Sequence, residues 1–279
     1  MKKYKNIILG KGFMGLAVYK AIDDEDKVCI WNYKPESSSK AAAGIVTESW
    51  YTASTIRSQY AYPFTLPMIK NGIDFLIKHD CELIRQDELR INEVNKGSEV
   101  KISKDTWLLW NKDEYLDSPE NQIEDEILEI DFENKIVKCS NETYEAENLF
   151  VCLGINLLDF TKSVPLRPRL GQALFVEDDD RDLRTYYVSP YTHFTLRPWK
   201  DGRTRIGDTT SKPHMGYLLK RFGKGEVVAG IRPAPIKEGY IYHKIKNTHV
   251  ITSGGRVGLG LSGMVGHQLQ ELIDGKIRF

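Results

Sequence analysis

The sequence predicts an α/β protein in which both ends of the chain contribute to a mostly parallel sheet, and the middle forms a mainly antiparallel insertion. Three observations predict this fold class. The first 32 residues have the pattern of a strand, a glycine turn, a helix and a second strand. Strand-like runs follow one another from 165 to 229, and the end of the chain repeats the order of strand, glycine-rich loop and helix. The first domain is therefore expected to be discontinuous in sequence.

Charge and cysteine usage limit the classes of partner. The 279 residues include 39 Lys plus Arg and 39 Asp plus Glu, so the formal net charge is zero. No overall field attracts nucleic acid or anionic lipid, and we expect small-molecule partners. The four cysteines form no C-x-x-C pair, and Cys29 and Cys152 lie in apolar runs. Buried, reduced thiols in a cytoplasmic protein are the expected state.

No targeting or membrane segment is expected. The first strand begins at about Tyr4, which leaves no room for a cleaved signal peptide, and nowhere do eighteen apolar residues run together.

The N-terminal segment has the spacing of a strand–helix–strand unit. Residues 4–9 are a short apolar run, and the glycine turn follows. Met14, Val18 and Ile22 then recur every four residues, as in a helix that packs on a sheet. The run "KVCIW" predicts the second buried strand. Two strands joined through a helix over this length imply parallel pairing.

The turn Gly10-x-Gly12-x-x-Gly15 has the glycines that a pyrophosphate site needs. One permits the tight turn, one lets the backbone approach phosphate, and one permits close packing of helix and strand. The pattern alone is weak, and tight packing is the alternative. Its position between a strand and an amphipathic helix favours nucleotide binding, because backbone amides at a helix N-terminus attract an anion.

Asn32 stands seventeen residues after Gly15, where a dinucleotide site usually has an acidic partner for the ribose. An amide oxygen still accepts a hydrogen bond but lacks the charge that strengthens it. We therefore expect weaker ribose binding. The alternative is that Asn32 only ends the strand.

The rest of the chain contains further local signals. "PESSSKAAAGIV" is a Ser/Ala/Gly segment, residues 64–79 have helical spacing after Pro67, and 84–147 alternate strand-like runs with charged turns. "HFTLRPWKDGRTRIGD" predicts a hairpin, because Asp-Gly supplies positive φ values. From 248 onward we expect a strand, a glycine-rich loop and a helix that begins near Gly263 and stops at Gly275.

In order along the chain, "ILGKGFMG", "SSSKAAAGIV", "NLFVCLGIN", "PRLGQALFV", "HFTLRPWKDGRTRIGDTT", "VVAGIRPAP" and "VITSGGRVGLGLSGMVGHQLQELI" resemble the FAD-dependent D-amino acid oxidase and glycine oxidase (DAO) family. The resemblance covers both ends and most of the second half, and is poor from about 50 to 125. It implies a discontinuous Rossmann-like FAD-binding domain with an inserted, mainly antiparallel substrate domain. The implied boundaries are 1–75, 125–164 and 230–279 for the FAD-binding domain, and 76–124 and 165–229 for the substrate domain.

The resemblance also implies which residues bind FAD. The glycine turn would hold the pyrophosphate, and Asn32 replaces the glutamate that the family normally has for the ribose. The serine segment would run alongside the phosphates and the flavin. The end of the strand at Leu153 and Gly154 would lie beside the adenine half of FAD, and the last glycine loop would face the isoalloxazine ring. The matched residues are Gly10, Gly12, Phe13, Met14, Gly15, Asn32, Ser38, Ser39, Ala43, Gly44, Leu153, Gly154, Gly255, Arg256, Val257, Gly258, Leu259 and Gly260.

The late glycine loop also has a physical argument for this role. A loop that leads into a helix aims the helix N-terminus into the cleft, where it stabilises negative charge on a reduced flavin. An ordinary strand-to-helix turn is the alternative. Five glycines between 254 and 263 exceed what a turn needs and favour the site.

Arg232 in "AGIRPAP" is the main substrate candidate. It matches the arginine that binds a substrate carboxylate in the resembling family, and a guanidinium binds a carboxylate through two parallel hydrogen bonds. A structural ion pair is the alternative. Arg197 is a second candidate anion contact and Tyr191 a candidate substrate contact. Residues of these types, including Tyr186 and Tyr187, are more often ordinary sheet-face residues than ligand contacts, and "LRPW" departs from the family pattern.

Together these features predict an FAD-dependent enzyme that oxidises the C–N bond of an amino acid or related amine by hydride transfer to flavin N5. The electron acceptor is O₂ or another molecule, and a homo-oligomer is left open. The alternatives are a dehydrogenase of a non-amino-acid amine in a biosynthetic pathway, and a flavin-binding protein without turnover. No H-E-x-x-H or G-x-S-x-G occurs, so neither a metal site nor hydrolase chemistry is expected.

Overall fold

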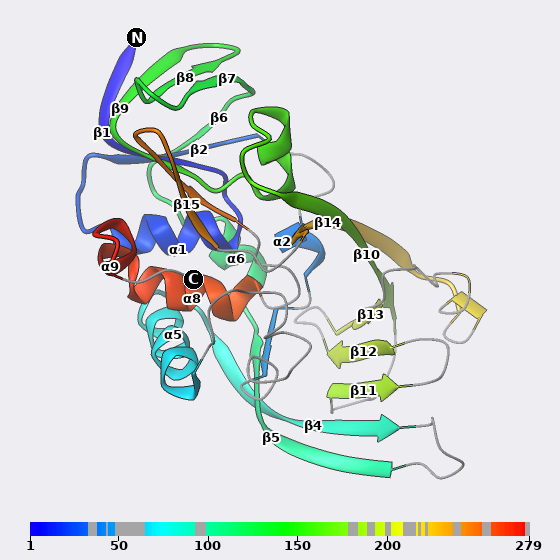
Figure 1. Cartoon of the computed structure of the whole chain (residues 1–279). Coiled ribbons are helices and arrows are strands. Elements are labelled where there is room, and N and C mark those ends of the chain that lie inside the picture. The colour runs from blue at the N-terminus through cyan, green and yellow to red at the C-terminus, as the bar shows by residue number, and fades with distance from the viewer. Residues whose placement is uncertain are drawn as a thin grey trace.

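Two β-sheets with helices on one of them organise the protein (Figure 1). The computed structural model describes residues 1–32, 38–42, 44–47, 65–92, 99–177, 184–188, 193–198, 202–208, 216, 219–220, 223–236, 241–252 and 258–276.

Sheet A is mostly parallel and uses both ends of the chain. Among the described residues its strands are β1 (Lys2–Leu9), β2 (Lys27–Trp31), β6 (Gln122–Glu124), β7 (Ile127–Asp131), β8 (Ile136–Cys139), β9 (Thr143–Val151), β15 (Tyr242–Ile245) and β16 (Thr248–Ile251). The main path runs β15–β16–β9–β1–β2–β6, with β7 and β8 attached at β9. The pairs β16–β9, β9–β1, β1–β2 and β2–β6 are parallel. This confirms the predicted discontinuous sheet.

Both faces of sheet A are covered, which explains why its strands are apolar throughout. Ile8 of β1 faces the cluster formed with the helices, while Ile7 and Leu9 face the opposite cluster. The helices on the first face are α1 (Phe13–Ala21), α5 (Leu66–Lys78), α8 (Gly258–His267) and α9 (Leu269–Ile273). The second face is covered by the β7–β8 hairpin and the short helix η1 (Gly154–Asp159).

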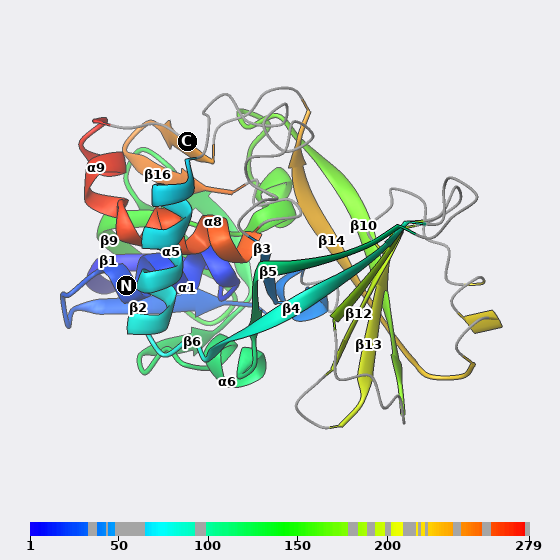
Figure 2. The same ribbon diagram turned by 90° about the horizontal axis from the view of Figure 1, so that it is seen from below.

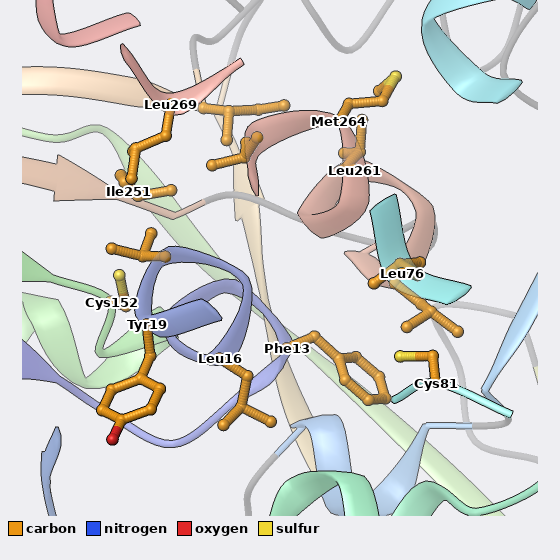
Figure 3. Packing of buried hydrophobic residues seen from close by; sticks show 14 of the residues in the cluster. Phe13, Leu16, Tyr19, Leu76, Cys81, Cys152, Ile251, Leu261, Met264 and Leu269 are labelled. Atoms are coloured by element: carbon orange, nitrogen blue, oxygen red, sulfur yellow. The ribbon is translucent and has the colours of Figure 1, made fainter. Parts of the chain in front are cut away.

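The helix α1 is buried more widely than its sequence spacing predicts. Val18 is fully buried, but Leu16 and Ala17 are equally buried, and Met14 and Ile22 are only partly buried. The reason is that α1 packs both on sheet A and against α8, so it needs two apolar faces. Figure 3 shows α1 and α8 contributing side chains to one cluster.

The helix α5 begins where the sequence predicts. Thr65 caps it by accepting a hydrogen bond from the amide of Met68 at 3.5 Å, and Pro67 lies in the first turn. Proline suits that position because its missing N–H would have no partner inside the helix.

The C-terminal helix differs from the prediction in two ways. It begins at Gly258 rather than near Gly263, and it is divided at Gln268 into α8 and α9 before Gly275, which has φ of +71°. Gly263 therefore lies inside the helix. A Cβ on Gly263 would lie 2.2 Å from the carbonyl oxygen of Gly72 in α5. This glycine thus permits a close crossing of two helices, which the sequence pattern alone did not reveal.

Gly263→Ala is expected to destabilise the protein by about 2–3 kcal/mol, because the new methyl group overlaps the backbone of α5. Gly258→Ala in the same helix is the matched control: among the described residues nothing lies within 4 Å of its Cβ. It should leave stability unchanged or raise it by up to about 1 kcal/mol through helix propensity. Urea unfolding followed by circular dichroism measures both. Equal stability of the two variants would contradict the close crossing.

Sheet B is the antiparallel insertion, and Figure 2 shows it extending away from the helices. Its order is β14–β10–β13–β12–β11–β4–β5–β3, and the pair β11–β4 is parallel. The strands are β3 (Ile45–Thr47), β4 (Leu83–Asn92), β5 (Glu99–Leu109), β10 (Leu166–Val176), β11 (Arg184–Val188), β12 (His193–Pro198), β13 (Thr204–Asp208) and β14 (Glu226–Pro235). The fold class predicted from the sequence is thereby confirmed.

The predicted hairpin is present. The strands β12 and β13 pair from Pro198 opposite Thr204, and Gly202 between them has φ of +84°. The boundaries of the two domains stay a prediction. The strand β3 hydrogen-bonds to β5 of sheet B, although it comes from the segment 1–75 that was assigned to the first domain.

Two short helices connect the sheets. They are α2 (Ser38–Ala41) and α6 (Lys112–Leu116). Figure 1 shows α2 beside β14 and β10, and it packs against both strands. The serine segment therefore forms a helical turn, and the strand β3 follows it.

The four cysteines, Cys29, Cys81, Cys139 and Cys152, are free and buried, as predicted. Burial raises the pKa of the Cys29 thiol to about 12. Such thiols are unreactive near neutral pH.

Candidate functional site

The turn between β1 and α1 requires glycine at two positions. Gly10 has φ of +100°, and a Cβ on it would lie 2.7 Å from the carbonyl oxygen of Cys152. A Cβ on Gly15 would lie 1.8 Å from the carbonyl oxygen of Gly10. A Cβ on Gly12 would meet the flexible side chain of Ser39 at 3.0 Å. Gly10 and Gly15 are thus required by the fold, whereas Gly12 keeps the backbone open beside the helix N-terminus.

The N-terminus of α1 contacts the serine segment. The Phe13 amide donates a hydrogen bond to Ser39 Oγ at 3.1 Å, and Gly12 provides no side-chain cap. The first turn of α1 contains no acidic residue to neutralise the positive end of the helix dipole. The Phe13 side chain points into the core near Cys81 and Leu76 (Figure 3). An anion at this turn would therefore meet backbone amides.

The carboxyl ends of parallel strands meet at the same turn. Gly10 N donates to the carbonyl of Ile30 in β2 at 2.8 Å. Asn32 directly follows β2 and is exposed, while Leu153 and Gly154 follow β9. In open α/β sheets this edge is where ligands bind. The sequence-predicted residues of the first strand, second strand and later strand end are thus brought together.

Lys11, which sequence reasoning did not single out, connects this turn to the edge of sheet A. Its Nζ lies 3.7 Å from the centre of the Trp31 ring and donates hydrogen bonds to Asp117 at 2.8 Å and Gln122 at 3.2 Å. The side chain is 9% exposed. Lys11 therefore fixes the turn to β2 and β6 through contacts that only the folded chain brings together.

Sheet B reaches the turn through β14. Gly154 has φ of +59°, and a Cβ on it would lie 3.8 Å from Pro233 Cγ. The Thr252 hydroxyl donates to the carbonyl of Gly154 at 3.3 Å. Arg232 precedes Pro233 on β14, so the main substrate candidate lies on a strand that contacts a predicted cofactor residue.

Two arginines of sheet B lie close together. Arg205 on β13 is only 6% exposed, and its Nη2 donates a hydrogen bond to the carbonyl of Ala41 in α2. Arg232 is partly buried, and its guanidinium packs over Gly171 of β10, where a Cβ would lie 3.4 Å from Nε. Burial first, and then the charge of Arg232, lower the pKa of Arg205 to about 10. Arg205 therefore stays charged at neutral pH.

The end of α2 is held by a second buried cation. Lys112 of α6 is 3% exposed, and its Nζ donates to the carbonyl of Ala42 at 3.4 Å. The carbonyl of Gly44, which has φ of +63°, accepts a hydrogen bond from Leu109 N at 2.7 Å. The segment that the resemblance matches to the flavin is thus fixed by α6 and by β5 of sheet B. Neither Lys112 nor Arg205 was predicted. Arg205 lies in an alternating strand-like run and Lys112 in a polar run, so neither pattern distinguishes a buried cation from an exposed one.

The structure leaves some predicted site residues undescribed and places Arg197 by its backbone pairing. Ala43, Tyr191, Gly255, Arg256 and Val257 lie outside the described residues. Arg197 lies directly opposite Arg205 in the β12–β13 ladder.

Three residues assigned to the late glycine loop, Gly258, Leu259 and Gly260, form the first turn of α8 instead. The expected loop is therefore shorter than predicted, and the helix N-terminus lies earlier in the chain.

Within the described residues, no three His, Cys, Asp or Glu side chains gather closely enough to hold a metal ion. None of the helices described there is long and apolar enough to cross a membrane.

Comparison with known proteins identifies the fold. No protein-family model and no curated protein matches the chain. Glycine oxidase from Geobacillus kaustophilus matches with a TM-score of 0.72 and 14% identity over 99% of this chain and 95% of that chain. Glycine oxidase from Bacillus cereus ATCC 14579 matches with a TM-score of 0.72 and 18% identity over 98% and 96%. The chain has the fold of these oxidases.

The same fold also occurs with other substrates. L-α-glycerophosphate oxidase from Mycoplasma pneumoniae, solved with FAD bound, matches with a TM-score of 0.70 and 13% identity over 98% of this chain and 95% of that chain. Because one fold supports different chemistry, the function must be argued from the site residues.

Proposed function

We propose that this protein is an FAD-dependent oxidoreductase that oxidises the C–N bond of an amino acid or a related amine. One observation carries the proposal: three parts of the chain converge on α2. Ser39 binds the N-terminus of α1, Ala41 accepts a hydrogen bond from Arg205 of sheet B, and Ala42 accepts one from Lys112. A helical turn so placed would hold a cofactor between the glycine turn and the arginines.

The residues present suit FAD. Its pyrophosphate would lie at the N-terminus of α1, where Gly12 allows close approach and no acidic residue competes. Ser39, Leu153 and Gly154 would line the path from there toward sheet B. When bound, FAD supplies at N5 the acceptor for a hydride, and the protein orients the substrate. The solved neighbours, one of them with FAD bound, support this assignment.

Arg232 would orient the substrate. Its planar guanidinium binds a carboxylate through two hydrogen bonds, which fixes the α-carbon relative to the group that accepts the hydride. Arginine does not act as a base near neutral pH, so its part is binding and polarisation. An amine that reacts in its neutral form needs no proton removed by the protein at that step.

The decisive experiment is to release the cofactor from the purified protein, identify it, and titrate the flavin anaerobically with substrates. We expect FAD, and bleaching by amino acids. Bleaching by other amines alone would favour the non-amino-acid dehydrogenase, and reduction by hydroxy compounds alone would refute amine oxidation. A protein that neither carries nor takes up flavin would refute the proposal. Reoxidation in air identifies O₂ as an acceptor.

Asn32→Glu is expected to tighten FAD binding about five- to tenfold, because a carboxylate accepts a stronger hydrogen bond from a ribose hydroxyl than an amide does. Fluorescence titration of the apoprotein at fixed ionic strength measures the dissociation constant. Asn32→Gln is the control, since it changes side-chain length without adding charge, and it should not tighten binding. Weaker binding by Asn32→Glu would mean that Asn32 has a different role.

A further inference from the structure

Arg205 of β13 is a buried cation without an acidic partner among the described residues. It is 6% exposed, and its Nη2 donates a hydrogen bond to the neutral carbonyl of Ala41. Its buried Nε has no hydrogen-bond partner there. Arg203, two residues earlier on the same hairpin, provides the contrast, because its Nη1 forms an ion pair with Glu226 at 2.6 Å. No negative charge within the described part of the chain thus compensates Arg205.

The guanidinium of Arg205 is held in one place by its neighbours. Gly207 is two residues further along β13, so both residues point to the same face of sheet B. A Cβ on Gly207 would lie 2.3 Å from Arg205 Nη1. The guanidinium therefore lies over this glycine, and from there it reaches the carbonyl of Ala41 in α2. The positive charge thus has a fixed position relative to α2.

Arg205 meets α2 in the segment proposed to follow FAD from its pyrophosphate to its flavin ring. Ser39 Oγ accepts a hydrogen bond from Phe13 N at the N-terminus of α1, where the pyrophosphate is proposed to lie. Ala41 is two residues further along, and Gly44, which the resemblance matches to the flavin, is three residues beyond that. Arg205 therefore contacts this segment on the flavin side of Ser39 and approaches it from sheet B, the predicted substrate sheet.

The flavin ring is the part of FAD whose charge changes during the proposed reaction. The hydrogen and both electrons of the substrate C–H bond pass to N5 as a hydride, so the ring gains one negative charge and the amine becomes an iminium cation. The pyrophosphate keeps the same charge throughout. A fixed cation in a site of low dielectric constant interacts strongly with a charge that forms nearby, because little water screens it.

We propose that Arg205 is a fixed positive charge that stabilises the reduced, negatively charged flavin and thereby raises its reduction potential. The inference rests on the proposed function for the presence of FAD. Arg205 acts through space and has no part in binding the substrate. A permanent carboxylate partner would cancel this effect, whereas a counter-charge that forms only on reduction uses a cation that is otherwise costly to bury.

The test measures the reduction potential of the FAD-loaded protein by equilibration with a reference dye. We expect Arg205→Met to lower the potential by about 30 mV or more, which is about tenfold or more in the preference for reduced over oxidised FAD. Arg205→Lys keeps the charge and should retain most of the potential. Arg203→Met, which removes an ion-paired charge from the same hairpin, should leave it unchanged. An unchanged potential in Arg205→Met, or an equal fall in Arg203→Met, would overturn the proposal.

Binding of oxidised FAD separates this role from a structural one. Arg205→Met should bind oxidised FAD nearly as tightly as the unaltered protein and lose affinity for reduced FAD. Equal weakening in both redox states would mean that Arg205 contacts the pyrophosphate or only fixes α2, and would overturn the proposal. Arg205→Gln is the second neutral variant. Its amide can still donate to the Ala41 carbonyl, so it should lower the potential as Arg205→Met does if the charge is what matters.

The outcomes also distinguish this inference from the proposed function. The dye measurement needs no amine, so a lower potential in Arg205→Met would support the fixed charge even if no amine reduced the flavin, a result that would refute amine oxidation. Reduction by amines together with an unchanged potential in Arg205→Met would refute only the role of Arg205. A protein that takes up no flavin would refute both.

Discussion

Replacing Gly15 with alanine should lower the free energy of unfolding by about 3 kcal/mol or more and abolish measurable FAD binding. The added Cβ would lie 1.8 Å from the carbonyl oxygen of Gly10 and 3.4 Å from Cys152 Cβ. The first contact is with backbone, which has no rotamer to move, so the turn itself must shift. Because that turn presents the amides of the proposed pyrophosphate site, stability and cofactor binding fail together.

Gly12→Ala is the matched variant that separates the two effects. Its Cβ would meet Ser39 Oγ at 3.0 Å, and a serine side chain can rotate away. We expect a loss of stability below about 1 kcal/mol, together with at least about a hundredfold weaker FAD binding, since the methyl group occupies the space that phosphate needs. Urea unfolding and fluorescence titration measure the two quantities. FAD binding by Gly12→Ala as tight as in the unaltered protein would contradict the proposed pyrophosphate site.

The elements that the sequence predicts correctly are those with local causes. The segment from β1 to β2 follows from apolar runs separated by a glycine turn, and the β12–β13 hairpin follows from Asp201 and Gly202. The helix α5 follows from the helical spacing after Pro67. In each case the determining residues are within a few positions of the element, so a single sequence contains the necessary information.

The elements that it misses depend on contacts between distant segments. The start of α8 could not be found from its glycines, because Gly263 is required by Gly72, nearly two hundred residues earlier in the chain. The position of α2 depends in the same way on hydrogen bonds from Phe13 and Arg205. Glycines that look like parts of a ligand loop can thus be parts of a helix crossing.

The candidate site likewise has a part that the sequence predicts and a part that it does not. Its backbone component, the glycine turn, is predictable because positive φ and close approach restrict the residue type to glycine. Its charged component is not, because an arginine in an alternating strand has the same pattern whether it faces solvent or α2. Only the fold distinguishes Arg205, because it buries this side chain and brings the guanidinium to the carbonyl of Ala41.

Arg232→Met should lower kcat/KM for a carboxylate-bearing substrate by about a thousandfold, or about 4 kcal/mol, because one partner of a charge-assisted, partly buried pair is lost. Arg232→Lys restores the charge without the planar fork and should recover only part of this loss. Stopped-flow reduction of the flavin, with the rate and the apparent dissociation constant fitted separately, measures the effect.

The matched control is Arg167→Met, which removes an exposed arginine from the neighbouring strand β10 and should leave the kinetics unchanged. If Arg232 instead serves a structural ion pair, Arg232→Met will reduce stability, and the reduction kinetics of the folded fraction will be normal. An amine that lacks a carboxylate provides the final discrimination: its reduction rate should be insensitive to Arg232→Met, since it has no group for the guanidinium to bind. Equal losses for substrates with and without the carboxylate would show that Arg232 acts on the site as a whole and does not recognise this anion.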